Sequence, residues 1–170
     1  RVRDIVFGIA PLINAAGRLA DADQAVHLLL AKTQSEAQDT LRTLHLRNDM
    51  RKEYEQRILR AAKAMLRADT QLANRNVIVL HQKHWHKGVL GIVASKLVEQ
   101  YYRPVLLLAE SDGRLMGSAR STKYVDIHSA LASCEKLLIN FGGHRHAAGV
   151  QLESHQLFFF TNNLEAAIEK

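Results

Sequence analysis

Apolar residues recur at helical spacing in a stretch without proline or glycine, from Ser35 to about Ala68. Ser35 followed by Gln38 matches a capping box and predicts the start of a helix. We expect one long helix of about 30 residues, or about 45 Å at the usual rise per residue. Its many charges are explained either by a solvated face or by contact with DNA. A helix this long and polar is typical of a connection between two domains.

Residues 1–34 precede this helix. An apolar run from Ile5 to Ile13 leads into a small-residue loop, Asn14–Arg18. A helix is then expected with one apolar face, made of Ala22, Val26, Leu29 and Leu30. This stretch is too short to bury a core of its own, and the chain begins at Arg1 rather than Met. We therefore expect residues 1–34 to be the tail of a domain outside this sequence.

From residue 71 to residue 170, strand-like and helix-like patterns alternate. Short apolar runs predict strands at Val77–Leu80, Pro104–Ala109, Leu115–Arg120 and Ala148–Leu152. Helical spacing predicts helices at Gly88–Tyr102, after Asp126 with Ile127, Ala130, Leu131 and Leu137, and at Leu157–Ile168. This order predicts an α/β domain with a mixed sheet.

Composition narrows the class of protein. The formal net charge of +6 and the pI of about 9.7 favour a polyanionic partner. Apolar runs are far shorter than the roughly 20 residues of a membrane helix, so no membrane contact is expected. Cys134 is the only cysteine, which excludes an internal disulfide and fits a reducing cytoplasm.

Ser118 and Arg120 are the first candidate for chemistry. They lie two residues apart in a predicted strand, so both side chains point to the same face. A guanidinium binds phosphate through two parallel hydrogen bonds, a hydroxyl adds a donor, and Gly117 would allow close approach of the backbone. An edge-strand arginine paired with a carboxylate explains the pattern equally well.

The loop around His86 is the second candidate, because it joins a buried strand to the start of a helix. Backbone N–H groups at a helix N-terminus bind anions, and His86 and Lys87 would add to this. Trp85 either stacks on a base or packs in a core or hinge. His81, His84 and His86 together suggest a metal only weakly, since neither carboxylate nor thiolate lies beside them.

Gly142, Gly143 and His144 form the third candidate. Adjacent glycines permit a backbone path close to a ligand, with N–H groups free for phosphate. His144 could donate to a phosphoryl oxygen or act near the scissile bond. A tight turn with a surface histidine explains the same three residues. No Asp-His-His or Asp-rich cluster suited to a two-metal centre occurs in the sequence, so we assign no metal ligands to these 170 residues.

In this order and spacing, the motifs resemble the DHH phosphoesterase superfamily, and within it the RecJ family. The segments that carry the resemblance span nearly the whole chain: 7–11, 13–19, 51–53, 85–95, 103–105, 117–121, 141–144 and 147–149. The resemblance implies a DHH domain with Mn²⁺ or Mg²⁺ outside this sequence. It also implies that residues 71–170 are the DHH-associated domain, connected to it by a helix at 35–70.

The implied activity is 5′→3′ degradation of single-stranded DNA in recombination and repair. Ser118 and Arg120 would bind the 5′-terminal phosphate, and Gly142, Gly143 and His144 would close over the reacting nucleotide. Asn14 and Arg18 match a motif that lines the cleft. A cytoplasmic monomer is expected, with a helicase or single-strand-binding protein as possible partners.

Two residues depart from the RecJ pattern. Leu12 stands where arginine is common, so we expect one basic contact fewer, and Tyr124 stands where glycine is common. Two other functions stay open: a DHH-family phosphodiesterase acting on short RNA or cyclic dinucleotides, and a non-catalytic nucleic-acid-binding module. The Asn14–Arg18 motif and the long helix argue against the phosphodiesterase.

Overall fold

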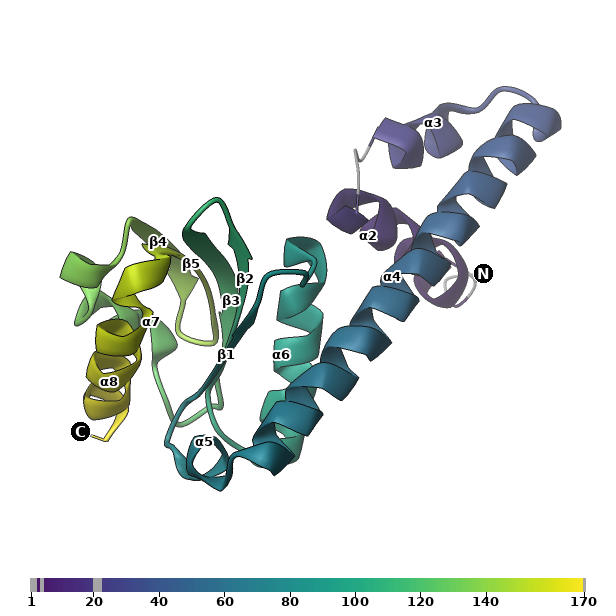
Figure 1. The fold of residues 1–170 in the computed structure, drawn as a ribbon. Helices are drawn as coiled ribbons and strands as arrows, with labels where there is room; N and C mark the ends of the chain where they lie inside the picture. The colour runs from purple at the N-terminus through teal and green to yellow at the C-terminus, as the bar shows by residue number, and fades with distance from the viewer. Residues whose placement is uncertain (1–2, 4, 20–22, 170) are drawn as a thin grey trace. The chain divides into compact units, whose positions relative to one another are not determined.

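The computed structural model describes residues 3, 5–19 and 23–169. The chain divides into two compact units, residues 1–56 and 57–170. Helix α4 (Gln34–Ala68) belongs to both, and it confirms the long helix expected from the sequence (Figure 1). Its start differs by two residues from the prediction. The Thr33 hydroxyl accepts from the Glu36 N–H at 3.2 Å, and the Glu36 carboxylate accepts from the Lys32 N–H at 3.0 Å, so Thr33 rather than Ser35 caps the helix.

The first unit is helical. It contains a π-helix η1 (Ile5–Ile9), α2 (Ala10–Leu19), α3 (Asp23–Leu30) and the first part of α4. Its small core consists of Leu12, Ala16, Ala25 and Leu44. Leu12, where a basic contact was in question, is therefore a packing residue, 3% exposed.

Two expectations for this unit were wrong. Asn14–Arg18 is not a loop but part of α2, because Leu12, Ala15 and Ala16 give that segment a buried stripe at helical spacing. In α3, Ala25 is the buried residue, whereas Val26, Leu29 and Leu30 are exposed. The remaining residue of the expected apolar face, Ala22, lies outside the described residues.

The second unit is built on a five-stranded sheet with the order β1-β2-β3-β5-β4. β1 and β2 are parallel and the other neighbours are antiparallel, which confirms the mixed sheet. The strands are β1 (Ile78–Gln82), β2 (Val105–Ser111), β3 (Arg114–Arg120), β4 (Asn140–His144) and β5 (Ala147–Glu153). The helices are α5 (Thr70–Asn74), α6 (Lys87–Tyr101), α7 (Ile127–Ala132) and α8 (Leu157–Ile168), and the 3-10 helices are η2 (Glu135–Leu137) and η3 (Ser154–Gln156).

The helices cover the two faces of the sheet unequally. α7 and α8 lie on one face, over a core of alternate strand residues that includes Leu106, Leu115, Val150 and Leu152, and Phe160 of α8 packs into the same core (Figure 1). α6 lies on the other face and packs on β2 and β3. The β5–β4 side of that second face therefore stays open beside the start of α6.

The β4 strand was not expected from the sequence, since two glycines make a poor strand former. It forms because it pairs with β5 along its whole length, from Asn140 opposite Gln151 to His144 opposite Ala147. The helix after Asp126 is also shorter than predicted: α7 ends at Ala132, and Leu137 belongs to η2 instead.

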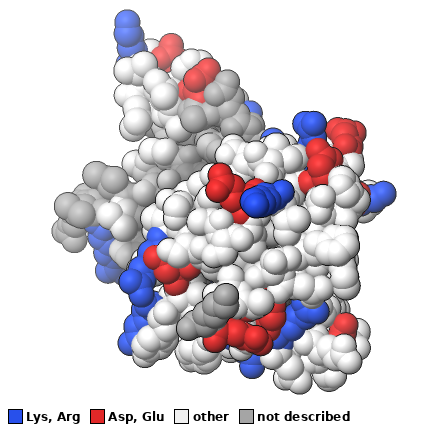
Figure 2. All heavy atoms as spheres, turned by 90° about the vertical axis from the view of Figure 1, so that its left-hand side faces the viewer, with Lys and Arg blue, Asp and Glu red and all other residues white. Residues whose placement is uncertain are grey.

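Charges on the visible face of Figure 2 lie in small mixed groups of acidic and basic side chains on a largely uncharged surface. On α4, charged residues pair along the helix, as Arg42 does with Asp39 and Lys52 with Asp49. These pairs favour a solvated face for that helix. Among the described helices, none is both long and apolar enough to cross a membrane.

Candidate functional site

The open face of the sheet carries three rows of residues that run across β3, β5 and β4. Side chains alternate between faces along a strand, so the register places every second residue of each strand on the same face. One row is Met116, Gln151 and Asn140. The next is Ser118, Gly149 and Gly142, and the last is Arg120, Ala147 and His144. The sequence-predicted residues Ser118, Arg120, Gly142 and His144 thus share one face.

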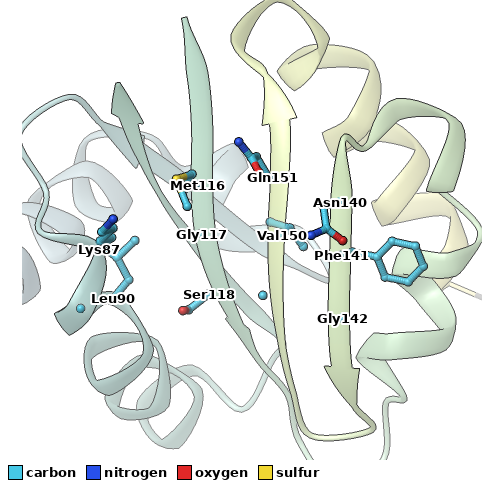
Figure 3. Close-up of a pocket in the computed structure, with 12 residues that line it drawn as sticks. Lys87, Leu90, Met116, Gly117, Ser118, Asn140, Phe141, Gly142, Val150 and Gln151 are labelled. Carbon is cyan, nitrogen blue, oxygen red and sulfur yellow. The ribbon is translucent and has the colours of Figure 1, made fainter. Parts of the chain in front are cut away.

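The middle row leaves a trough in this face, because only Ser118 among its three residues carries a side chain. A cavity of about 560 Å³ lies over it and is bounded by the start of α6 through Lys87, Gly88 and Leu90. This volume is in the range of small-molecule and cofactor sites. Figure 3 shows Met116, Ser118, Gln151 and Asn140 around the trough on neighbouring strands, with Phe141 pointing away. Phe141 packs instead beside the His128 ring, with the centroids 5.6 Å apart.

Arg120 lies at one end of the trough and is held by α6. One of its guanidinium nitrogens donates to the Ala119 carbonyl at 2.8 Å. A Cβ built on Gly91 of α6 would lie 2.5 Å from another, so the guanidinium occupies the space that a side chain at position 91 would take. The absence of a side chain at Gly91 therefore leaves room for the Arg120 guanidinium against α6.

Gly117 lies between Ser118 and Met116 on β3, and its backbone lines the cavity. A Cβ there would come within 2.5 Å of the Leu107 carbonyl and the Leu108 side chain. The absence of a side chain at this position therefore allows β2 and β3 to pack closely. The role of Gly117 towards a ligand stays a prediction.

Gly143 and His144 end the β4 strand. Gly143 has φ +146°, and a Cβ there would collide with the backbone of Ala147 and Ala148. His144 is exposed, and its Nδ1 accepts from the His146 N–H at 3.3 Å. That hydrogen bond engages Nδ1, so Nε2 is the ring nitrogen that remains for a ligand.

At the start of α6, His86 is the N-cap. Its Nδ1 accepts from the Gly88 N–H at 3.2 Å, so this nitrogen is already engaged with the helix. Lys87 is exposed and lines the trough. Lys87 and the positive end of the helix dipole therefore make this wall electropositive. Trp85 is 7% exposed, which favours the packing role for it.

Asn14 and Arg18 lie in the first unit, four residues apart on α2 and both exposed. That spacing places them on the same face of the helix. Within the part of the chain that the structure describes, no group of three His, Cys, Asp or Glu residues could hold a metal ion. The described residues therefore offer no ligand set for Mn²⁺ or Mg²⁺, the metals that the resemblance implies for a domain outside this sequence.

Three residues of the trough were missed in the sequence. Met116, Gln151 and Asn140 form the row at the end opposite Arg120. Lys87, which was expected only as part of the loop before α6, lines the same cavity. The alternation that identified Ser118 and Arg120 also gives Met116. The positions of Asn140 and Gln151 follow only from the pairing of β4 with β5. The glycines of β4 prevented its prediction as a strand, so this pairing could not be predicted.

Comparison with known proteins gives the family. The model of the DHHA1 domain family matches residues 74–170. The RecJ single-stranded-DNA-specific exonuclease of Thermus thermophilus is 39% identical over 163 residues, covering 96% of this chain and 23% of that protein. The Bacillus subtilis RecJ is 37% identical over 153 residues, covering 89% of this chain and 19% of that protein.

Solved structures agree with these relatives. A structure of exonuclease RecJ bound to manganese superposes with a TM-score of 0.85 at 38% identity, covering 100% of this chain and 42% of that one. Thermus thermophilus RecJ with Mn²⁺ gives 0.86 at 37% identity, covering 99% of this chain and 25% of that one. The chain thus spans about a fifth to a quarter of the length of the two curated relatives. By its matching domain, its mixed sheet and its RecJ relatives, the chain belongs to the DHHA1 domain family.

Proposed function

We propose that this chain is the substrate-binding part of a metal-dependent exonuclease that degrades single-stranded DNA in the 5′→3′ direction. The observation that carries the proposal is the trough, with its bare middle row, Arg120 at one end and Lys87 on its wall. The RecJ relatives, whose names specify single-stranded DNA, support it. Asn14 and Arg18 of the first unit would also bind the DNA, and residues 1–34 would be the tail of a DHH domain.

The roles of the residues follow from the rows. Ser118 and Arg120 would hold the 5′-terminal phosphate, since a hydroxyl and a guanidinium on adjacent rows both donate to its oxygens. The glycine floor at Gly149 and Gly142 would let the terminal nucleotide lie against the backbone. His144 at the end of β4 would close over it, and Gly143 would give the strand the backbone path that puts His144 there. His86 would act through the cap of α6, by orienting the first turn of that helix.

This chain would contribute positioning, not the hydrolytic centre. RecJ structures contain Mn²⁺ or Mg²⁺, and a metal of this kind, held by another part of the protein, would supply the hydrolytic chemistry. A terminal phosphate held at Arg120 would position the scissile phosphate relative to that hydrolytic centre. Such positioning lowers the entropic part of the activation barrier for hydrolysis. On this proposal the 170-residue chain alone degrades no DNA with Mn²⁺. Degradation at the rate of the full-length protein would contradict it.

Arg120→Ala in the full-length protein tests the phosphate contact. We expect a loss of about 1.5–3 kcal/mol in transition-state binding for DNA with a 5′-phosphate, because a hydrogen bond to a charged group is removed. DNA with a 5′-hydroxyl should lose far less. The measurement is kcat/KM on the two kinds of end. Equal losses on both would mean that Arg120 is structural or contacts the DNA backbone in general.

A further inference from the structure

Two loops are joined at the end of the sheet where the Arg120 row lies. One is the turn between β4 and β5, at Arg145 and His146, and the other is the stretch 121–125 between β3 and α7. The Ser121 N–H donates to the His146 carbonyl at 3.0 Å, and the Ile127 N–H donates to the Arg145 carbonyl at 3.1 Å. The Ser121 hydroxyl also donates to the Val125 carbonyl at 2.8 Å. These hydrogen bonds make the two loops one ordered surface.

An exposed aromatic ring stands on this surface among basic side chains. Tyr124 is 79% exposed. The Lys123 ammonium lies 4.9 Å from the centre of its ring, and an Arg145 guanidinium nitrogen donates to the Lys123 carbonyl at 3.5 Å. The rings of His144 and His146 lie 6.2 Å apart beside them. The nearby carboxylate of Asp126 accepts from the Ser129 N–H at 3.1 Å and interacts with Arg145.

This surface continues the trough. Ser121 follows Arg120 directly, and Arg145 follows His144 directly, so both loops leave from the last row of the open face. A strand held by its terminal phosphate at Arg120 would have this ring and these cations within reach of neighbouring nucleotides. Single-strand binding sites combine these same two elements: cations for the backbone and aromatic faces for the bases.

We propose that Tyr124 is a stacking platform for a base of single-stranded DNA, with Lys123 and Arg145 binding the adjoining phosphates. The inference rests on the proposed function and adds a second contact area to it, outside the trough. The Lys123 ammonium lies over the Tyr124 ring and makes a cation–π contact with it. A base stacks on the remaining surface of the ring, and removing an exposed aromatic of this kind is expected to weaken binding by about five- to tenfold.

The test measures binding of a 5′-phosphorylated oligonucleotide to the full-length protein by fluorescence anisotropy, with divalent metal removed by EDTA to prevent degradation. The variants are Tyr124→Ala, Tyr124→Phe and, as matched control, Tyr102→Ala. Tyr102 is 82% exposed at the end of α6 and belongs to neither of the two loops. A second oligonucleotide carries abasic sugars in place of its internal nucleotides, so it keeps the phosphates and lacks the bases.

We expect Tyr124→Ala to bind intact DNA about five- to tenfold more weakly than the unsubstituted protein. Tyr124→Phe and Tyr102→Ala should retain the original affinity, and Tyr124→Ala should bind the abasic strand as well as the unsubstituted protein does. Unchanged affinity of Tyr124→Ala for intact DNA would overturn the inference. Equal weakening on intact and abasic strands would overturn it too, because the ring would then only be placing the cations.

Different results would contradict the proposed function and the stacking role of Tyr124. An unsubstituted protein that binds no single-stranded DNA overturns the proposed function and this inference together. A protein that binds it, and that distinguishes the two kinds of 5′ end through Arg120 but is insensitive to Tyr124→Ala, overturns the inference alone.

Discussion

Gly142 and Gly143 are neighbours in β4, but glycine serves a different purpose at each. A Cβ on Gly142 would meet nothing within 4 Å, whereas one on Gly143 would collide with the backbone of β5. Gly143 also has φ +146°, a conformation that residues with a side chain rarely adopt. Gly143 is therefore required by the fold, and Gly142 by the trough.

This difference gives a paired prediction. Gly143→Ala should lower the free energy of unfolding by at least about 1–3 kcal/mol, the usual cost of a residue held in an unfavourable backbone conformation. Gly142→Ala should leave unfolding unchanged and weaken binding of single-stranded DNA, since its methyl group enters the floor of the trough. Thermal unfolding and DNA anisotropy on both variants measure this. Equal stabilities of the two variants would contradict the assignment.

Gly91 offers a second test at the scale of one residue. Gly91→Ala should raise the free energy of unfolding by up to about 1 kcal/mol, because alanine favours the helix. Its methyl group displaces the Arg120 guanidinium, which can move as the far end of a flexible side chain. Preference for 5′-phosphorylated ends should then fall while stability does not. Gln100→Ala, on an exposed position of the same helix, is the control, and an unchanged preference in Gly91→Ala would show that Arg120 is not positioned by this contact.

Some site residues could be predicted from the sequence. In these cases the alternation of side chains along a single strand is enough to show which face of the sheet the residue occupies. Ser118 and Arg120 were identified in this way, because an apolar run marked β3. Asn140 and Gln151 could not be, because their place depends on register between two strands. Tyr124 was noticed only as a departure from a family pattern, since its exposure and its neighbours come from loops that the pattern does not describe.

At the scale of elements, the apolar periodicity predicted α4, α6 and α8 nearly to their ends, and it identified every strand except β4. These elements bury regular stripes of side chains, and apolar periodicity in a sequence indicates such buried stripes. β4 has little to bury. Only Phe141 in it packs on the core, and its position depends on pairing with β5. The same reason explains why the sequence predicts a loop at Asn14–Arg18, inside α2: the buried stripe of this helix consists mainly of alanines.

The α7 cap predicts a pH dependence. Hydrogen bonding from the Ser129 backbone, aided by Arg145, lowers the pKa of Asp126 below its ordinary value of 3.8. A carboxyl with a lowered pKa in the folded state stabilises the fold above 3.8, and the contribution is lost as the pH falls through the folded value. Asp126→Asn keeps a capping oxygen but does not titrate. Its stability relative to the unsubstituted protein should therefore be lowest at neutral pH and should rise on acidification below about pH 4.

Chemical denaturation of Asp126→Asn and of the unsubstituted protein from pH 7 to pH 2.5 measures the difference between their free energies of unfolding. The other carboxylates titrate in both proteins, so their effect cancels in this difference. A stability difference that stays constant over this range would mean that the charge of Asp126 contributes nothing to the cap.

At the scale of the whole molecule, the question is how much of α4 the second compact unit needs in order to fold. From the sequence, the DHH-associated domain is expected to begin at residue 71, after the helix. The second compact unit of the structure begins at residue 57, and within residues 57–70 Ile58, Ala62 and Leu66 are buried. The Gln82 side chain of β1 also donates to the Met65 sulfur at 3.7 Å. The last turns of α4 are therefore part of the core of the second unit.

Two fragments test this boundary. Burying one Ile or Leu side chain stabilises a fold by about 1.5–3 kcal/mol, out of a total of about 5–15 kcal/mol for a domain. We therefore expect a fragment of residues 57–170 to unfold cooperatively, and one of residues 71–170 to lose a large part of that stability. Within the longer fragment, Ile58→Ala with Leu66→Ala should reproduce much of the loss, and Arg60→Ala with Arg67→Ala, at exposed positions, should not. If residues 71–170 are as stable as residues 57–170, α4 is a connection only, and the trough needs nothing from it to keep its shape.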